Sequence, residues 1–248
     1  MKTMYKAMMG AAMLLAGSTM QAQNLQLHYD LGRYTHPESQ AGRPYMLLTL
    51  EQQSVDKFGD TFYFVDMNFQ KQGAVAANWK FMRNLRFWKG PWALHLRYDG
   101  GIRFLNTNTT SPAPRSAMSI NDAFFVGPSY TYLRADRKLM LSAAPLYKYI
   151  KGHAEPHNWE LVGIWKYTPG NGVFSANGFI TYWREKMPYG TTTRLMTQPQ
   201  FWLNLNKLRG VSDDLKLSVG TELRIANNVD MKGFLFAPSI ALKWNFGK

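Results

Sequence analysis

Ionisable and aromatic side chains that could act on a small molecule recur at every second position of this sequence. Successive side chains of an extended chain point to opposite sides, so residues two apart share a side. A wall that combines cations, carboxylates and aromatic rings could bind a polar solute or stack on a planar ring. The first candidate binding residues are Phe62, Phe64, Asp66, His95, Arg97 and Asp99.

The same residues could instead form a catalytic site, but their spacing argues against it. On one strand His95 and Asp99 would lie roughly 13 Å apart, too far for direct pairing. The sequence contains no Gly-x-Ser-x-Gly motif and no cysteine, which excludes a nucleophile elbow and thiol chemistry. We therefore predict no catalytic residues and no cofactor, and keep a membrane-embedded lipid-modifying enzyme as an alternative.

A second cluster, His153, Glu155 and His157, has residue types that bind metals. Two histidines and a carboxylate need a fixed geometry to hold a zinc ion. Pro156 disfavours the helical turn that would bring the three side chains together. We predict no metal site.

The elements that position the candidate residues are β-strands, because apolar and polar residues alternate along most of the chain. In 215–225, leucine, valine and isoleucine occupy one parity while Lys216, Glu222 and Arg224 occupy the other. Only a strand segregates such a pattern. Ten clear segments and two weaker ones, 74–87 and 173–184, give about twelve strands. The clear segments are 24–31, 45–52, 61–69, 92–99, 123–132, 139–150, 159–167, 194–205, 215–225 and 234–246.

Short turns alternate with longer connections, which follow odd-numbered strands, apart from exceptions at 70–73 and 206–213. An even-stranded membrane barrel with both termini in the periplasm has this alternation of short turns and long outer loops. The longer connections are 35–43, 105–121, 152–158 and 186–192.

The start of the chain has the layout of an export signal. Lys2 and Lys6 precede a short apolar run, 7–17, and Ala22 is a suitable last residue before cleavage. We predict a signal peptide over 1–22 and one domain over 23–248. Without the two lysines, 27 basic residues remain against 16 acidic ones. An exported basic chain favours an anionic membrane surface or an anionic solute over nucleic acid.

Two fold classes fit the alternation: an antiparallel transmembrane β-barrel in an all-β chain, and a soluble sandwich or lipocalin-like barrel with an apolar core. Charges on the polar face and tryptophan and tyrosine near strand ends favour the transmembrane barrel. The chain also closes on an aromatic strand ending at Phe246. We predict a barrel of about twelve strands in the bacterial outer membrane.

Residues 56–69 (DKFGDTFYFVDMNF) and the closing Trp244-Asn245-Phe246 resemble the Tsx-type nucleoside-specific channel family. The chain is also similar in style to a Bacteroidetes group of barrels related to that family. The resemblance implies a monomeric twelve-stranded barrel with a narrow lumen that offers aromatic and ionisable side chains to a nucleoside. By motif match, it implies that Phe62, Phe64 and Asp66 face inward.

The expected inward-facing charges carry an excess of cations, with eight basic residues to five acidic ones when His95 is set aside. The sign favours anionic or hydrogen-bond-rich solutes, although each charge could equally pair across neighbouring strands and hold the barrel in shape. The set is Glu51, Asp66, Lys80, His95, Arg97, Asp99, Lys148, Glu160, Lys166, Arg194, Lys216, Glu222, Arg224 and Lys243.

The sequence therefore predicts a channel for passive diffusion of small hydrophilic solutes, with nucleosides suggested by resemblance. The alternative is a structural or surface-interaction barrel without transport. Expected partners are the outer-membrane lipid and lipopolysaccharide, whose phosphates Arg43, Arg115 and Lys186 could bind, and the solute itself.

Overall fold

The protein is one closed antiparallel barrel. The computed structural model describes residues 20–71, 73–105 and 116–246, and only the backbone of 20–22. Its strands are β1 (Met20–Asp30), β2 (Met46–Asp56), β3 (Gly59–Gln70), β4 (Gly73–Leu85), β5 (Trp92–Phe104), β6 (Ala117–Leu133), β7 (Leu139–Ile150), β8 (His157–Tyr167), β9 (Phe174–Arg184), β10 (Thr193–Thr197), β11 (Gln200–Asn204), β12 (Leu217–Asn227) and β13 (Phe234–Asn245).

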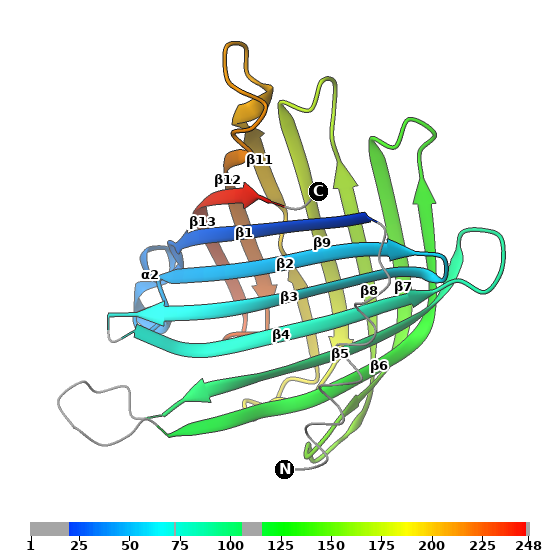
Figure 1. Ribbon diagram of the computed structural model, residues 1–248. Coiled ribbons are helices and arrows are strands. Elements are labelled where there is room, and N and C mark those ends of the chain that lie inside the picture. Colours follow the sequence, from blue (N-terminus) through cyan, green and yellow to red (C-terminus); the bar gives the residue numbers. More distant parts are fainter. Residues whose placement is uncertain (1–19, 72, 106–115, 247–248) are drawn as a thin grey trace.

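Strands that follow one another in sequence pair, except β10 and β11, and β1 pairs with β13 to close the sheet. β10 and β11 both lie between β9 and β12, so they are two halves of one strand. The barrel is therefore twelve-stranded, as the sequence predicts. In Figure 1, β1 to β4 cross the front of the barrel, and β7 to β9 run steeply behind them.

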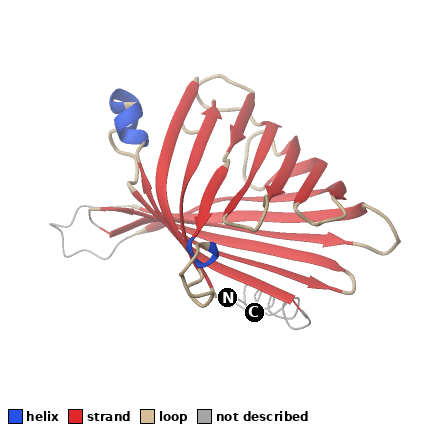
Figure 2. Ribbon diagram, turned by 90° about the horizontal axis from the view of Figure 1, so that it is seen from above, coloured by secondary structure: helices blue, strands red, loops and turns tan. Residues whose placement is uncertain are grey.

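In the described part of the chain, helix is confined to short segments, as Figure 2 shows from above. They are α2 (Gly32–Thr35), α3 (Pro37–Gln40) and the 3-10 turn η1 (Leu205–Lys207). Among the described residues, no helix has the length and apolar character needed to cross a bilayer.

Strand boundaries agree closely with the alternation in the sequence, and the two weaker segments are β4 and β9. Two predictions were wrong in detail. Residues 117–121, expected in a loop, begin β6. The segment 194–205 is interrupted at Gln198-Pro199, where proline has no amide hydrogen to donate to a ladder.

The faces of the strands identify the fold as transmembrane rather than soluble. Large apolar side chains such as Leu161, Ile240 and Trp244 lie exposed on the outside, while Arg97 and Glu160 are buried inside. In a soluble barrel these positions would be reversed. The lipocalin-like alternative is therefore wrong, and the architecture is that of outer-membrane barrels.

The two ends of the barrel differ. β1 begins and β13 finishes at one end, which we call the terminal end. The opposite end, which we call the loop end, holds the described connections 31–45, 151–156, 185–192 and 228–233, together with residues 71, 105 and 116. Residues 1–19 of the expected signal peptide lie outside the described residues, while the backbone of 20–22 continues β1 and pairs with 53–55.

Candidate functional site

The parity of the sequence places nearly all candidate residues on the inward face. Pairing fixes this face, because inward residues of one strand lie opposite inward residues of the next. Thus His95 lies opposite Asn84, and Asp99 lies opposite Lys80. The candidates on the inward face are Phe62, Phe64, Asp66, His95, Arg97, Asp99, Arg194, Glu222 and Arg224.

The largest group of lumen charges is an ion network that spans β4, β5 and β8. Arg97 lies at its centre, 3.0 Å from Asp99 and 2.8 Å from Glu160. Lys80 Nζ lies 3.5 Å from the other oxygen of Asp99. The Arg97 guanidinium also lies 3.6 Å from the ring centroid of Phe125. Arg97 therefore has a carboxylate partner on two sides and a ring against it, which fixes it in place.

The network continues toward the loop end through a second set of ion pairs. Glu185 accepts from Lys148 Nζ at 2.7 Å and lies 2.8 Å from Arg194. Trp183 Nε1 also donates to Glu185, at 2.9 Å. Burial opposes ionisation of this carboxyl, but Lys148 and Arg194 outweigh burial and hold the pKa of Glu185 below its usual range. We call these seven charges, from Lys80 to Arg194, the lumen ion network.

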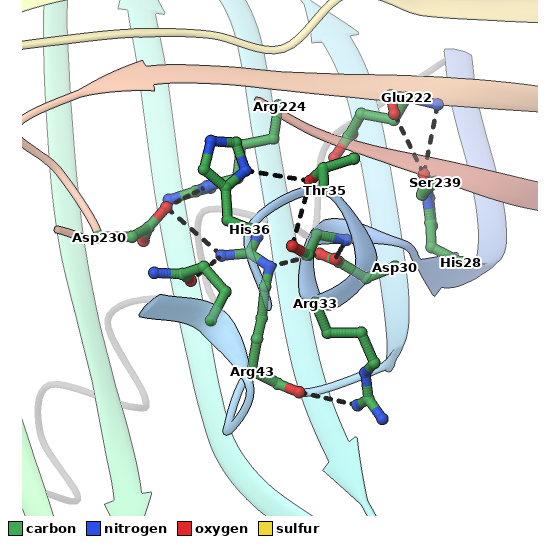
Figure 3. Close-up of polar contacts among 12 residues, drawn as sticks. His28, Asp30, Arg33, Thr35, His36, Arg43, Glu222, Arg224, Asp230 and Ser239 are labelled. Carbon is green, nitrogen blue, oxygen red and sulfur yellow. Dashed lines mark hydrogen bonds and ion pairs between the residues drawn. The ribbon is translucent and has the colours of Figure 1, made fainter. Parts of the chain in front are cut away.

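A separate cluster joins the first connection of the loop end to the lumen wall (Figure 3). Arg43 lies 2.9 Å from Asp30 and 3.5 Å from Asp230, which in turn pairs with Arg224 at 2.7 Å. Burial alone would raise the pKa of Asp230, yet Arg224 and Arg43 lower it overall. We call Asp30, Arg43, Arg224 and Asp230 the mouth cluster.

Beside the mouth cluster, two hydrogen bonds hold the segment 31–45 against β13. Leu31 N donates to Pro238 O at 2.8 Å, and Thr35 Oγ1 donates to Phe236 O at 2.6 Å. Gly32 packs so closely that a Cβ there would lie 2.7 Å from the Cβ of inward-facing Ala237. The segment therefore folds onto the wall at the mouth of the lumen.

Amide side chains replace ion pairs on the opposite part of the wall. Glu222 accepts from Gln198 at 2.8 Å and from Gln200 at 2.7 Å. Gln200 also donates to Gln26 Oε1 at 3.3 Å. His28, nearly fully buried, contacts Gln26 and Ser239 at 3.0 and 3.1 Å. These neutral groups can donate or accept as a passing solute requires.

One cation of this wall stands over an aromatic ring. Lys243 Nζ lies 4.0 Å from the ring centroid of Trp202, which is 2% exposed. Among the described residues, Lys243 has no carboxylate within ion-pair distance. A cation held by a ring rather than by a carboxylate keeps its charge available to an anion in the lumen.

The residues identified by resemblance lie together. The rings of Phe62 and Phe64 are 6.1 Å apart, and Lys80 Nζ lies 5.9 Å from the centroid of Phe64. Asp66 accepts from Thr49 Oγ1 at 2.5 Å. Two adjacent rings and a carboxylate thus line one stretch of β3.

His95 has its hydrogen-bond partner on the neighbouring strand β4. Its Nδ1 contacts Asn84 Oδ1 at 2.8 Å, and Asn84 Nδ2 donates to Asp60 at 2.8 Å. The amide orientation therefore makes His95 Nδ1 the donor. His95 Nε2 is buried without a hydrogen-bond partner among the described residues. Asp99 belongs instead to the ion network, so the two residues act separately.

Lys216 is the candidate that the fold leaves out. It precedes β12 and is exposed at the terminal end, so the prediction that it joins the lumen wall was wrong. The expected strand began at 215, but the chain turns there, with Lys216 N donating to Asp214 O.

The residues considered for a metal site have other partners. His153 Nδ1 contacts the backbone of Glu155, and His157 Nδ1 contacts Tyr147 at 2.5 Å. The Glu155 carboxylate pairs with Arg184 and with Lys186. Lys186, one of the basic residues expected at lipopolysaccharide, thus lies in a loop beside an acid, while Arg115 lies outside the described residues.

Glu185, Asp230 and Trp202 were not identified from the sequence, and Arg43 was considered only as a contact for lipopolysaccharide. Arg43, Glu185 and Asp230 lie in connections, where the alternation that marks a strand face is absent. Trp202 has inward parity in 194–205, but apolar neighbours on both sides hide it. The signal available in the sequence was that these charged residues lie in connections next to strands that carry inward-facing basic residues.

Comparison with known proteins places the fold. A family model described as a domain of unknown function, DUF5020, matches residues 22–246. The barrel is similar to the NanC porin, with a TM-score of 0.54 and 9% identity over 91% of this chain and 100% of that one. A KdgM porin gives a TM-score of 0.49 and 8% identity over 91% and 99%. None of the curated protein sequences matches significantly.

Proposed function

The chain belongs to the DUF5020 family, and we propose that it is a bacterial outer-membrane channel for passive diffusion of small hydrophilic solutes. The loop end faces outward, the terminal end faces the periplasm, and residues 1–22 direct export. The observation that carries the proposal is the inversion of the barrel: apolar residues meet lipid and charged or amide groups line the interior.

The width of the barrel supports a selective channel rather than a wide pore. Eight strands leave an interior filled by side chains, and sixteen or more leave an open aqueous channel. Twelve strands lie between, so a solute touches the wall and the wall residues set the selectivity. The basic excess of the chain, +13 before export, favours anionic or hydrogen-bond-rich solutes.

Nucleosides are the solute class suggested by the resemblance to Tsx-type channels, and that assignment rests on the β3 residues. Phe62 and Phe64 offer adjacent rings on which a base could stack, and Asp66 offers a carboxylate to a sugar hydroxyl or a base amine. Base stacking on aromatic side chains is worth about 1–3 kcal/mol per base.

Planar-bilayer conductance of the purified barrel tests both the channel function and the specificity for nucleosides. We expect single-channel steps, and we expect adenosine to reduce their current. Absence of steps would replace the channel with a structural barrel, whose lumen charges only hold its shape. Steps that adenosine does not block would keep the channel and exclude nucleosides as its solute.

Phe64→Leu separates stacking from simple lumen filling. Leucine retains an apolar side chain on β3 but removes the ring, so adenosine block should weaken while the unblocked conductance changes little. Phe124→Leu, on the lipid-facing side of β6, is the matched control and should leave the block unchanged. Equal block in all three proteins would contradict the assignment of Phe64.

A further inference from the structure

The wall between β6 and β7 lacks ladder pairing at its centre. The two strands pair from Ala123 to Val126 and again from Tyr130 to Leu133, but not across 127–129 and 144–146. Pairing resumes in the same register, with Val126 opposite Tyr147 and Tyr130 opposite Ala143. Three residues on each strand, about 10 Å of wall, are therefore held without regular hydrogen bonds between the strands.

Two prolines cause this gap. Pro128 and Pro145 lie opposite each other in the register, and both are exposed on the lipid-facing side. Neither has an amide hydrogen to donate. The strands still touch, because a Cβ on Gly127 would lie only 2.1 Å from Pro145 O. Packing of a glycine against a carbonyl thus closes the wall at this point.

The lumen side of the same wall carries an apolar cluster, which lies beside the buried Ser129 and Lys148 of these two strands. Phe125, Ala144, Leu146 and Ile150 form a buried cluster, with Val162 of β8 packed against it. On the outer side, Val126, Tyr130 and Tyr147 are exposed. Apolar residues therefore lie on both sides of the unpaired segment, in the lipid-facing surface and in this buried cluster.

We propose that the strands part at the unpaired segment between β6 and β7, and that one acyl chain of a membrane lipid enters there and packs against Leu146 and Val162. Opening breaks no ladder hydrogen bond there, because the prolines have already removed them. The chain leaves one apolar environment for another, so burial of its methylenes opposes neither entry nor exit. The opening does not depend on whether polar solutes cross the lumen.

Brominated lipids test the opening directly. Because the sequence has no cysteine, Leu146→Cys gives a single site for a small fluorophore on the inner side of the gap. In phosphatidylcholine vesicles with bromine on the acyl chains, we expect a loss of emission relative to unbrominated vesicles. Emission equal in the two vesicles would overturn the proposal.

Ala241→Cys is the matched control. Ala241 is buried on the inward face of β13, where pairing with β1 and with β12 is continuous, so its label should keep its emission in brominated vesicles. Equal loss of emission at both sites would overturn the proposal, because bromine would then reach the interior by another route.

Restoring the ladder provides the second test. In the Leu146→Cys background, Pro128→Val and Pro145→Val return two amide donors and should suppress the loss of emission. Persistence of the loss in a folded double variant would contradict the role of the gap. If a label at 146 prevents folding, a label on Val162→Cys of β8 lies against the same apolar cluster, and the same two outcomes apply.

Discussion

The two parts of the lumen wall satisfy their polar groups in different ways. From β4 to β10 the wall carries charges that pair with one another, with Arg97 between Asp99 and Glu160. On β1 and β11 to β13 it carries mainly amides, hydroxyls and small residues around a few charges, with Gln200 between Glu222 and Gln26. The first arrangement is fixed by its own partners, and the second can exchange partners with a solute.

This difference explains why a charge facing the lumen does not by itself identify a solute contact. Arg97 and Glu160 form an ion pair at 2.8 Å, so each charge is neutralised by the other before it can attract a solute. Lys243 stands over Trp202 instead of a carboxylate. We therefore expect the ion network to maintain the barrel and the amide wall to set selectivity.

The largest expected effect is loss of stability on breaking the ion network. Glu160→Gln leaves Arg97 buried with only Asp99 as a partner and should cost about 3–5 kcal/mol of unfolding free energy. Urea unfolding in detergent or lipid measures it. The double variant Arg97→Gln/Glu160→Gln should recover part of the loss, because the network then returns to an excess of one cation, as in the parent protein. A single variant as stable as the parent would show that the network is not structural.

An intermediate effect is expected from pH at the loop end. Because Arg224 and Arg43 lower the pKa of Asp230, its contribution to the mouth cluster is complete above the ordinary carboxyl value of about 3.9. The contribution is lost as the pH falls through the lowered value of the folded protein. Hydrogen exchange of segment 31–45, corrected for intrinsic rates, should therefore accelerate only at strongly acidic pH.

Asp230→Asn provides the control for this pH effect. It should expose 31–45 to exchange at neutral pH and remove the Asp230 contribution to the acid dependence. Equal protection of this segment in the parent at strongly acidic and at neutral pH would contradict the role of the mouth cluster.

The smallest expected effect is on ion selectivity, and it distinguishes the amide wall from the rim of the barrel. Lys243→Gln removes a cation that has no ion-paired acid among the described residues, so the reversal potential in a salt gradient should shift toward cations. Lys216→Gln, at the exposed terminal end, should shift it less. A shift of the same size from both would place selectivity at the rim instead of on the amide wall.

Much of this fold could be predicted because one physical rule fixes it. Alternation within a strand determines which residues share a face, and it assigned Arg97, Glu222 and Arg224 to the inner side as found. The start of β6 was missed because Ser119, Asn121 and their neighbours lack alternation and read as a loop.

The partners of the lumen residues could not be predicted. Pairing depends on register and on the closure of β1 against β13, and one sequence does not contain that information. Arg43 and Asp230 approach each other only because two connections distant in sequence meet at one end of the barrel. The sequence showed the excess of basic residues on the inward face. It did not show that most charges of the ion network pair with one another.

Chemical access to the lumen tests the central claim most directly. A single cysteine at Phe64, on the inward face of β3, should react with a charged, membrane-impermeant thiol reagent added to the loop-end side of a bilayer, and the reaction should irreversibly reduce the single-channel current. A folded Phe64→Cys barrel that stays unreactive, and whose current is unchanged, would contradict a water-filled path along this wall.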